Sequence, residues 1–340
     1  MKLTPRISYR RNRDNWQFLR EDPEFFQNFH TTDVVTAEVH GSRLHKLGAL
    51  GFGVDYNYLF LNSSNLVDGE GSGEHLRHQV GVHLENRFVL MDGNLDLTPG
   101  LMALHLSDFG VSFYPGLDVG YRLSDNFKSF FNLGWTTRIP TFTDLFYEDS
   151  GNVGNPNLTE ENAFTYEVGL KYQQPAFNVS LSYFDREASD QIDWHRETVD
   201  DRWTPDNFSS ASYRGLDFNL KAMLSDMPVL DFISVGYTYL NATFEENDFA
   251  FSRNQLENLR HQVIINPQFS IGPVALNVVF KYNDRVSLED YYTINTNLTY
   301  SYKEHKIFLR AANLTDQLYR ETNLVDMPGR WISGGVNLSF

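Results

Sequence analysis

Hydrophobic residues recur at every second position along most of this sequence. Between residues 164 and 172, for example, aromatic and aliphatic residues alternate with Thr, Glu, Gly and Lys. A period of two is that of a β-strand, because successive side chains of a strand point to opposite faces. We predict about sixteen strands of roughly 9 to 13 residues, starting near residues 2, 34, 49, 77, 93, 109, 126, 162, 176, 209, 231, 259, 274, 291, 306 and 330.

The two faces of the predicted strands differ in composition. One carries Asn, Ser, Thr, Gly and charged residues throughout, so it must meet water, whereas the inner faces of a soluble sandwich are apolar. The other face is apolar and ends in aromatic residues, as expected where rings lie at a lipid–water boundary: Tyr9, Phe60, Tyr121, Trp135, Tyr172, Tyr183, Tyr239, Tyr282 and Tyr300. A soluble β-sandwich remains the alternative, since it also has one apolar face per strand.

The predicted connections alternate in length. Tight turns are expected at 46–48, 90–93, 124–126, 173–175, 225–228, 272–273 and 303–305. The intervening connections are long, at 11–33, 61–76, 137–161, 185–208, 244–258, 283–290 and 314–329, with 107–108 as a short exception. Outer-membrane barrels have this asymmetry, with short periplasmic turns and long outer loops. We therefore predict an all-β, antiparallel transmembrane β-barrel with an even strand number and both chain ends on the periplasmic side.

Composition excludes several other classes. Asp and Glu number 44 against 28 Lys and Arg, for a formal charge of −16, which argues against nucleic acid as a partner because such binding depends on clustered basic residues. The absence of cysteine removes thiolate metal sites and disulfides. No run approaches the roughly 18 apolar residues of a membrane helix.

Three segments resemble the signatures of one family, the TonB-dependent outer-membrane receptors, which import scarce ligands such as ferric siderophores, haem or cobalamin. The first is residues 137–161, similar to the family's Arg-x-Pro and Asn-Pro-Asn-Leu motifs. The second is residues 310–319, similar to the exit of the penultimate strand, and the third is the closing strand from residue 327. The matching residues are Arg138, Pro140, Asn155, Pro156, Asn157, Leu158, Asn313, Leu314, Pro328, Gly329 and Arg330.

The closing segment also carries a resemblance of its own. Residues 332–340 alternate and end on an aromatic residue, with Val336, Leu338 and Phe340 on one face. This resembles the signal that the outer-membrane barrel-assembly machinery reads, so that machinery and outer-membrane lipid are expected partners.

The resemblance implies a longer protein than the sixteen strands alone. Family barrels have about 22 strands around an N-terminal plug, preceded by a box that contacts the energy-coupling protein TonB and by a secretory signal. The sequence from Met1 opens directly into a strand pattern, without a plug, a box or a signal. We therefore expect residues 1–340 to be a truncated barrel domain whose contact with TonB requires the plug. The expected location is the outer membrane of a Gram-negative bacterium. We expect an incomplete sheet with two open edges, the alternative being a closed sixteen-stranded, porin-like diffusion pore.

Aromatic residues in the long connections are the candidates for ligand contact. They are Trp16 and Phe18 in the first, Phe142, Phe146 and Tyr147 in the 137–161 connection, and Trp194 and Trp203 in the 185–208 connection. Such rings suit a large, ring-bearing small molecule, although they could equally pack the loops against one another. Haem is disfavoured, because family haem receptors place a histidine between the two signatures and residues 141–154 contain none. Cobalamin and ferric siderophores remain, and residues 8–15 and 30–34 resemble cobalamin-receptor-like members.

No catalytic motif stands out, so we expect no enzyme activity, no cofactor and no metal site. The acidic run at 68–74 could bind calcium, but it lacks EF-hand spacing and a solvated loop is the simpler interpretation. His75 and His78 should lie on opposite faces of a strand. On the strand at 162–172, Leu170 should face lipid, whereas Gly169 and Lys171 should face the lumen and tolerate polar substitutions.

Overall fold

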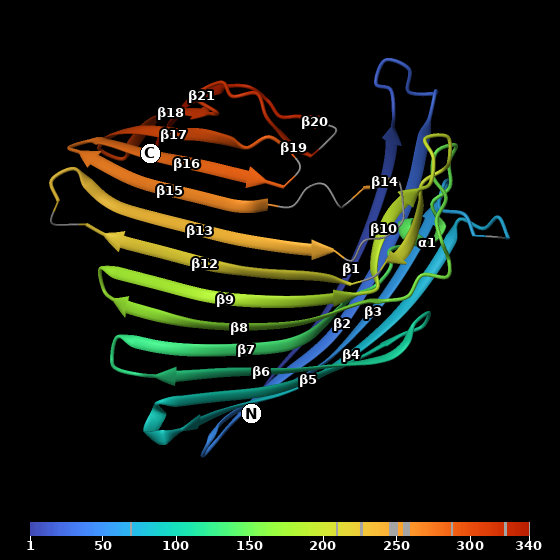
Figure 1. Ribbon diagram of the computed structural model, residues 1–340, viewed down its shortest axis with the longest axis horizontal. Coiled ribbons are helices and arrows are strands. Elements are labelled where there is room, and N and C mark those ends of the chain that lie inside the picture. The colour runs from blue at the N-terminus through green and yellow to red at the C-terminus, as the bar shows by residue number, and fades with distance from the viewer. Residues whose placement is uncertain are drawn as a thin grey trace.

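The computed structural model describes residues 1–68, 70–208, 210–224, 227–244, 251–253, 259–286, 288–322 and 325–339. Sixteen strands form one antiparallel sheet in which neighbours in the chain are neighbours in the sheet (Figure 1). They are β1 (Lys2–Gln17), β2 (Gln27–His45), β3 (Gly48–Ser63), β4 (Glu74–Leu90), β5 (Leu95–Leu106), β6 (Gly110–Arg122), β7 (Phe127–Arg138), β8 (Glu161–Gln174), β9 (Phe177–Ser189), β12 (Ala211–Met223), β13 (Leu230–Phe244), β15 (Leu259–Ile271), β16 (Val274–Arg285), β17 (Tyr291–Tyr302), β18 (His305–Ala312) and β21 (Trp331–Asn337).

All sixteen predicted strands are confirmed, and fifteen begin within three residues of the predicted start. The exception is β2, which begins at Gln27 instead of near residue 34. β1 and β2 stay paired up to Gln17 opposite Gln27, so the predicted 11–33 connection shrinks to residues 18–26. This end of the β1–β2 hairpin has polar residues on both faces, so hydrophobic residues do not recur there at every second position.

The sheet is curved and has two edges (Figure 1). β1 pairs with β2, and β21 pairs with β18, while no pairing among the described residues joins β1 to β21. The sixteen strands therefore do not close on themselves here. This agrees with the expectation of an incomplete sheet and not with that of a closed sixteen-stranded pore.

The apolar side chains of the strands lie on a face that this chain leaves uncovered. Val168 and Leu170 of β8 are 47% and 49% exposed, and Gly169 between them, on the polar face, is buried. We call the face of Leu170 the apolar face and that of Gly169 the polar face. None of the helices in the described ranges is long and apolar enough to cross a membrane.

Most of the smaller elements in the described residues gather at the end of the strands away from the tight turns, and only the 3-10 turn η1 (Met91–Gly93) lies at the tight-turn end (Figure 1). A short helix, α1 (Phe142–Phe146), lies between β7 and β8. The predicted 185–208 loop is wrong in part, because β10 (Gln191–Arg196) and β11 (Thr204–Phe208) form a hairpin there that continues onto β14 (Phe251–Ser252). The remaining elements are the pair β19 (Arg320–Thr322) and β20 (Val325–Asp326).

The expectation that Gly169 tolerates polar substitutions is wrong. A Cβ added there would lie 2.5 Å from Cζ of Phe130 and 2.7 Å from the carbonyl oxygen of Leu181. Phe130, opposite Gly169 in β7, occupies the space above the glycine. Its ring also lies 4.5 Å from Nζ of Lys171, so the polar face contains packed rings that alternation alone does not reveal.

Leu170→Arg is expected to destabilise the protein in lipid by about 2–4 kcal/mol, because it places a charge on the face that meets hydrocarbon. Lys171→Gln, one residue away on the polar face, is the matched control and should change the free energy of unfolding by less than about 1 kcal/mol, as at most exposed positions. Denaturant unfolding in lipid vesicles measures both. Equal costs for the two variants would contradict the assignment of the faces.

Candidate functional site

A capping box starts α1 directly after Pro140. The hydroxyl of Thr141 accepts a hydrogen bond from the backbone N–H of Asp144 at 3.1 Å, and the Asp144 carboxylate accepts one from the backbone N–H of Thr141 at 3.0 Å. These bonds satisfy donors that every helix leaves free at its first turn. A helix of five residues has little stability of its own, so the box and the packing of Phe142 and Leu145 hold it.

Asp144 and Arg138 join four elements. Arg138, the last residue of β7, donates to Glu161 at 2.5 Å and to Asp144 at 3.4 Å. Glu161, the first residue of β8, also accepts from the backbone N–H of Ile192 at 2.7 Å. The second oxygen of Asp144 accepts from the indole N–H of Trp194 at 3.2 Å. The Arg-x-Pro signature thus ties the ends of β7 and β8 to α1 and β10.

The Asn-Pro-Asn-Leu signature holds the second half of the same loop. The side chain of Asn155 accepts from the backbone N–H of Asn157 at 3.0 Å and donates to the carbonyl of Pro205 at 3.2 Å. Its backbone N–H donates to the carbonyl of Asp144 at 2.9 Å. Pro156 is exposed between the two asparagines, and Leu158 is 4% exposed. The motif therefore fastens the loop to α1 and to β11.

A compact apolar cluster lies beneath these contacts. It consists of Leu61, Leu66, Phe142, Leu145, Leu158 and Ile192, with Phe146 and Tyr147 packed against it. The ring of His75 stacks on Phe146 with centroids 4.2 Å apart. The guanidinium of Arg77 lies 4.7 Å from the Phe142 ring and donates to Asp108 at 2.7 Å and to the carbonyl of Pro140 at 3.1 Å. Phe142 and Phe146 therefore pack the loops together, which was the alternative to ligand contact.

The two tryptophans of the predicted site lie beside arginines. Trp203 has the guanidinium carbons of Arg196 at 4.7 Å and Arg253 at 4.5 Å from its ring, and Arg253 is also 5.3 Å from the ring of Trp194. Arg253 donates to the side chain of Asn152 at 2.6 Å. Backbone bonds between Trp203 and residues 151 and 153 hold this group against the signature loop. The result is a half-buried surface of rings and positive charge.

Trp16 and Phe18 form a separate cluster on the first hairpin. Trp16 is the second-last residue of β1 instead of lying in a loop, and its ring centroid is 5.8 Å from that of Phe18 and 6.1 Å from that of Phe26. Trp16 is 48% and Phe18 60% exposed. The structure thus brings Trp194 and Trp203 together around Arg253, packs Tyr147 against the apolar cluster, and leaves Trp16 and Phe18 in contact with each other.

The C-terminal motif residues connect the last two strands. Asn313, which is 4% exposed, donates to the carbonyls of Gln317 at 2.9 Å and Pro328 at 3.3 Å. The backbone N–H of Arg330 donates to Asp316 at 2.7 Å, and a Cβ on Gly329 would lie 2.8 Å from that carboxylate. Leu314 is 40% exposed. These contacts fix the exit of β18 and the entry of β21.

The closing strand exposes the residues of the expected assembly signal. Val336 and Leu338 are 59% and 55% exposed, and Val336 lies opposite Ile307 of β18 on the same apolar face. Phe340 lies outside the described residues.

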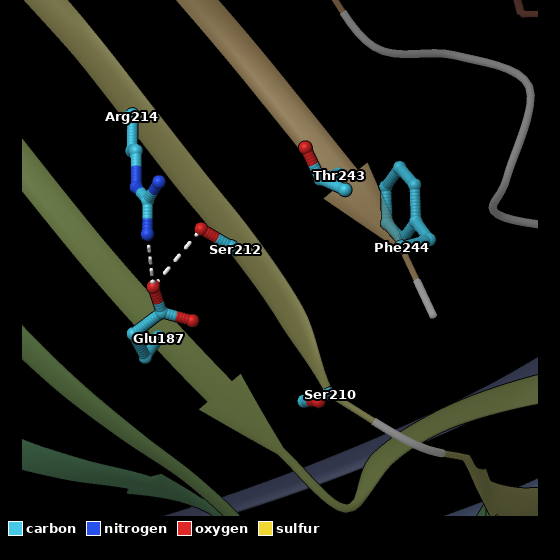
Figure 2. A pocket seen from close by; sticks show the side chains of 6 residues that line it. All are labelled: Glu187, Ser210, Ser212, Arg214, Thr243 and Phe244. Atoms are coloured by element: carbon cyan, nitrogen blue, oxygen red, sulfur yellow. Dashed lines mark hydrogen bonds and ion pairs between the residues drawn. The ribbon is translucent and has the colours of Figure 1, made fainter. Parts of the chain in front are cut away.

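A shallow polar pocket lies where β9, β12 and β13 reach the loop end (Figure 2). The Glu187 carboxylate accepts from Arg214 and from Ser212, both at 3.0 Å. Thr243 and Phe244 of β13 form the opposite wall in Figure 2. Because Arg214 also binds Asp185 at 2.9 Å, the carboxylates of this pocket are already paired.

This pocket was not predicted from the sequence. The sequence does contain two pairs of polar residues, each pair spaced two positions apart on one strand. They are Asp185 with Glu187 on β9 and Ser212 with Arg214 on β12. They meet only because the register places Ser212 opposite Glu187 and Arg214 opposite Asp185, and that register is not readable from a single strand.

A family comparison identifies the fold. The family described as "TonB dependent receptor-like, beta-barrel" matches residues 2–314. The chain belongs to the TonB-dependent receptor β-barrels. The family consists of receptors and transporters.

Two transporters are similar to the receptor barrel in sequence. The vitamin B12 transporter BtuB of Vibrio vulnificus is 32% identical over 111 residues, which are 33% of this chain and 18% of that protein. The vitamin B12 transporter BtuB of Photobacterium profundum is 25% identical over 211 residues, 60% of this chain and 34% of that protein. The chain thus matches about a third or less of the length of these relatives.

Solved receptors share the fold. A variant of the ferric enterobactin receptor PfeA of Pseudomonas aeruginosa, in complex with enterobactin, superimposes with a TM-score of 0.77 at 18% identity, covering 98% of this chain and 59% of that one. The siderophore receptor PirA of Acinetobacter baumannii gives 0.70 at 15% identity, covering 92% and 55%. The receptor-barrel chain thus spans somewhat more than half of their length.

Thr141→Ala is expected to destabilise the loop end of this receptor barrel by about 1 kcal/mol, the typical cost of losing a helix cap. The exposed Thr143 of the same helix is the matched control, and Thr143→Ala should change little. Hydrogen exchange of the amides of residues 141–158 measures the difference. Equal exchange in both variants would show that the capping box does not hold the loop.

Acid should loosen residues 147–153 in a step that depends on Asp149. Burial raises the pKa of Asp149, but hydrogen bonds from Asn152, Gly151 and Tyr147 outweigh it and leave the pKa below its usual value. A lowered carboxyl pKa contributes stability above the unfolded pKa that is lost as pH falls through the folded pKa. Limited proteolysis of this loop from pH 6 to pH 2 should show the step in the native protein and not in Asp149→Asn. The same profile in both would contradict it.

Proposed function

We propose that this chain is the barrel of an outer-membrane receptor that takes up a scarce small-molecule ligand by TonB-dependent transport in a Gram-negative bacterium. The observation that carries the proposal is the family match over residues 2–314. The organisation of the loop end supports it, because the signature loop holds a surface of rings and positive charge in place instead of leaving it free to move.

The ligand we propose is cobalamin, with a ferric siderophore as the second candidate. The relatives in sequence are named vitamin B12 transporters, whereas the structural neighbours named as siderophore receptors have 15–18% identity and share only the fold. Cobalamin is large and ring-bearing and carries a phosphodiester. The half-exposed Trp194 and Trp203, beside the guanidiniums of Arg196 and Arg253, offer stacking surfaces and positive charge to such a molecule.

Tyr147, Trp194 and Trp203 are the residues we favour for ligand contact. Their side chains are partly exposed, and backbone hydrogen bonds link residue 154 to Tyr147 and residues 151 and 153 to Trp203. Trp16 and Phe18 contact the ligand only if the hairpin of β1 and β2 moves toward Trp194 and Trp203. Phe142 and Phe146 support the surface from beneath, since both pack in or against the apolar cluster.

We propose further that the two sheet edges are completed by additional strands around a plug. Open edges expose unpaired N–H and C=O groups, which lipid does not satisfy. Closure of β1 onto β21 would make a porin-like pore, but the described strands leave these edges apart. The exposed Val336 and Leu338 are then positioned for the barrel-assembly machinery, and TonB would be reached through the plug.

Growth on limiting cobalamin tests this proposal. The full gene should restore growth to a cobalamin-requiring host that lacks its own outer-membrane cobalamin receptor, and it should fail to do so without TonB. Trp203→Ala should lower cell-surface cobalamin binding at least about tenfold, a loss of roughly 1.4 kcal/mol. Trp135→Ala is the control, since Trp135 lies on the apolar face of β7 against Phe164.

One outcome would contradict the receptor function, and another would contradict only cobalamin as its ligand. Growth restored equally without TonB, together with entry of unrelated hydrophilic solutes, would indicate the diffusion pore. Rescue on a ferric siderophore and not on cobalamin would retain the receptor and exchange its ligand for the second candidate.

A further inference from the structure

Four side chains that metals favour as ligands meet on the polar face near the middle of β2, β3 and β4. Glu38 and His40 are two residues apart on β2, and the register places Asp55 of β3 opposite Glu38. Gly53 of β3 lies between His40 on one side and His83 of β4 on the other. The pleat therefore directs all four side chains to the same face.

The ligand atoms of Glu38, His40 and Asp55 are close enough to share one ion, and His83 lies beside Asp55. Nε2 of His40 lies 2.9 Å from Oδ1 of Asp55 and 3.8 Å from Oε2 of Glu38. The nearest ligand atoms of Glu38, His40 and Asp55 all lie within 4.8 Å of one another. Nδ1 of His83 lies 3.7 Å from Oδ2 of Asp55. An ion bound at about 2.0–2.2 Å by nitrogen and oxygen requires ligand atoms roughly 3–4 Å apart.

Gly53 provides the space in which the two imidazoles come together. A Cβ at this position would lie 2.3 Å from Cε1 of His83 and 3.1 Å from Nδ1 of His40. The ring centroids of the two histidines are 5.1 Å apart. A side chain at residue 53 would push the rings apart, so the glycine forms a cradle for them on this sheet face.

The charge of the cluster favours a cation. Glu38 and Asp55 contribute two negative charges, and Arg6 of β1 pairs with the other Glu38 oxygen, Oε1, at 3.3 Å. Histidine binds metals in its neutral form, so the cluster with neutral imidazoles carries a net charge of about −1. The side chains of His40, Asp55, Glu38 and His83 are 44%, 25%, 20% and 34% exposed, which leaves the ligand atoms accessible to an ion.

We propose that this cluster binds one divalent transition-metal ion, of the class of Zn²⁺, Cu²⁺ or Ni²⁺, on the polar face of the sheet. Two imidazole nitrogens with two carboxylate oxygens suit these ions, whereas calcium and magnesium prefer oxygen alone. The site departs from the expectation of no metal site. It lies in mid-strand, away from the loop end where cobalamin contact is proposed, and it does not depend on that proposal. The competing explanation is a metal-free hydrogen-bonded network of His40, Asp55 and Glu38.

Zinc titration of the protein purified from outer membranes in detergent, after treatment with a chelator, tests the site. One saturable Zn²⁺ site is expected. His40→Gln and Asp55→Asn should each weaken it by at least the roughly 10- to 100-fold that loss of a supporting outer-shell partner costs. His45→Gln is the matched control, because His45 lies on the same strand but is bonded to Asn86 at 2.9 Å. Gly53→Ala keeps all four ligands and should also weaken binding.

A spectroscopic measurement on the unsubstituted protein gives an independent decision. Cu²⁺ added in place of Zn²⁺ should show electron paramagnetic resonance splitting from two imidazole nitrogens, reduced to one in His40→Gln. The absence of saturable Zn²⁺ binding, binding unchanged in both His40→Gln and Asp55→Asn, or a Cu²⁺ signal without nitrogen splitting would each overturn the site and leave the hydrogen-bonded network as the explanation.

Discussion

Backbone hydrogen bonding between neighbouring strands is the constraint on which the rest of this structure depends. A slip of one residue in any pair would exchange its apolar and polar faces. The register of β7 and β8 runs without interruption from Phe127 opposite Tyr172 to Arg138 opposite Glu161. The same register that puts Leu170 on the apolar face therefore also brings the Arg138 guanidinium to the Glu161 carboxylate at the loop end.

Charged side chains that lie on the apolar cluster organise the loop end. Asp144 caps α1, pairs with Arg138 and accepts from Trp194, so one carboxylate positions the helix, the strand end and a ring of the proposed binding surface. The apolar cluster below packs Phe142 and Leu145 of α1 and so holds the helix that carries Asp144. The segments at 138–144 and 155–158 thus act as the frame of the loop end, and the aromatic and cationic residues beside them form the proposed binding surface.

The strands were predictable from the sequence because their two faces differ, and the family from motifs that lie in loops. The early start of β2 was not predictable, since Phe29 is the only apolar residue among residues 27–33 and a single one gives no alternation. The hairpin of β10 and β11, the packing of Phe142 and the crowding at Gly169 depend on contacts between segments distant in sequence. Clusters such as Glu38, His40, Asp55 and His83 require the register of three strands, and alternation gives only the face of each residue.

The most direct test of the account is a single-cysteine scan of β8 in outer membranes, which is simplified because residues 1–340 contain no cysteine. A water-soluble thiol reagent should label Glu167→Cys and Lys171→Cys, whose side chains lie on the polar face. It should leave Val168→Cys and Leu170→Cys unlabelled, because those positions are expected to face lipid. Labelling of Leu170→Cys as fast as of Lys171→Cys would contradict a membrane-spanning sheet with one apolar and one polar face.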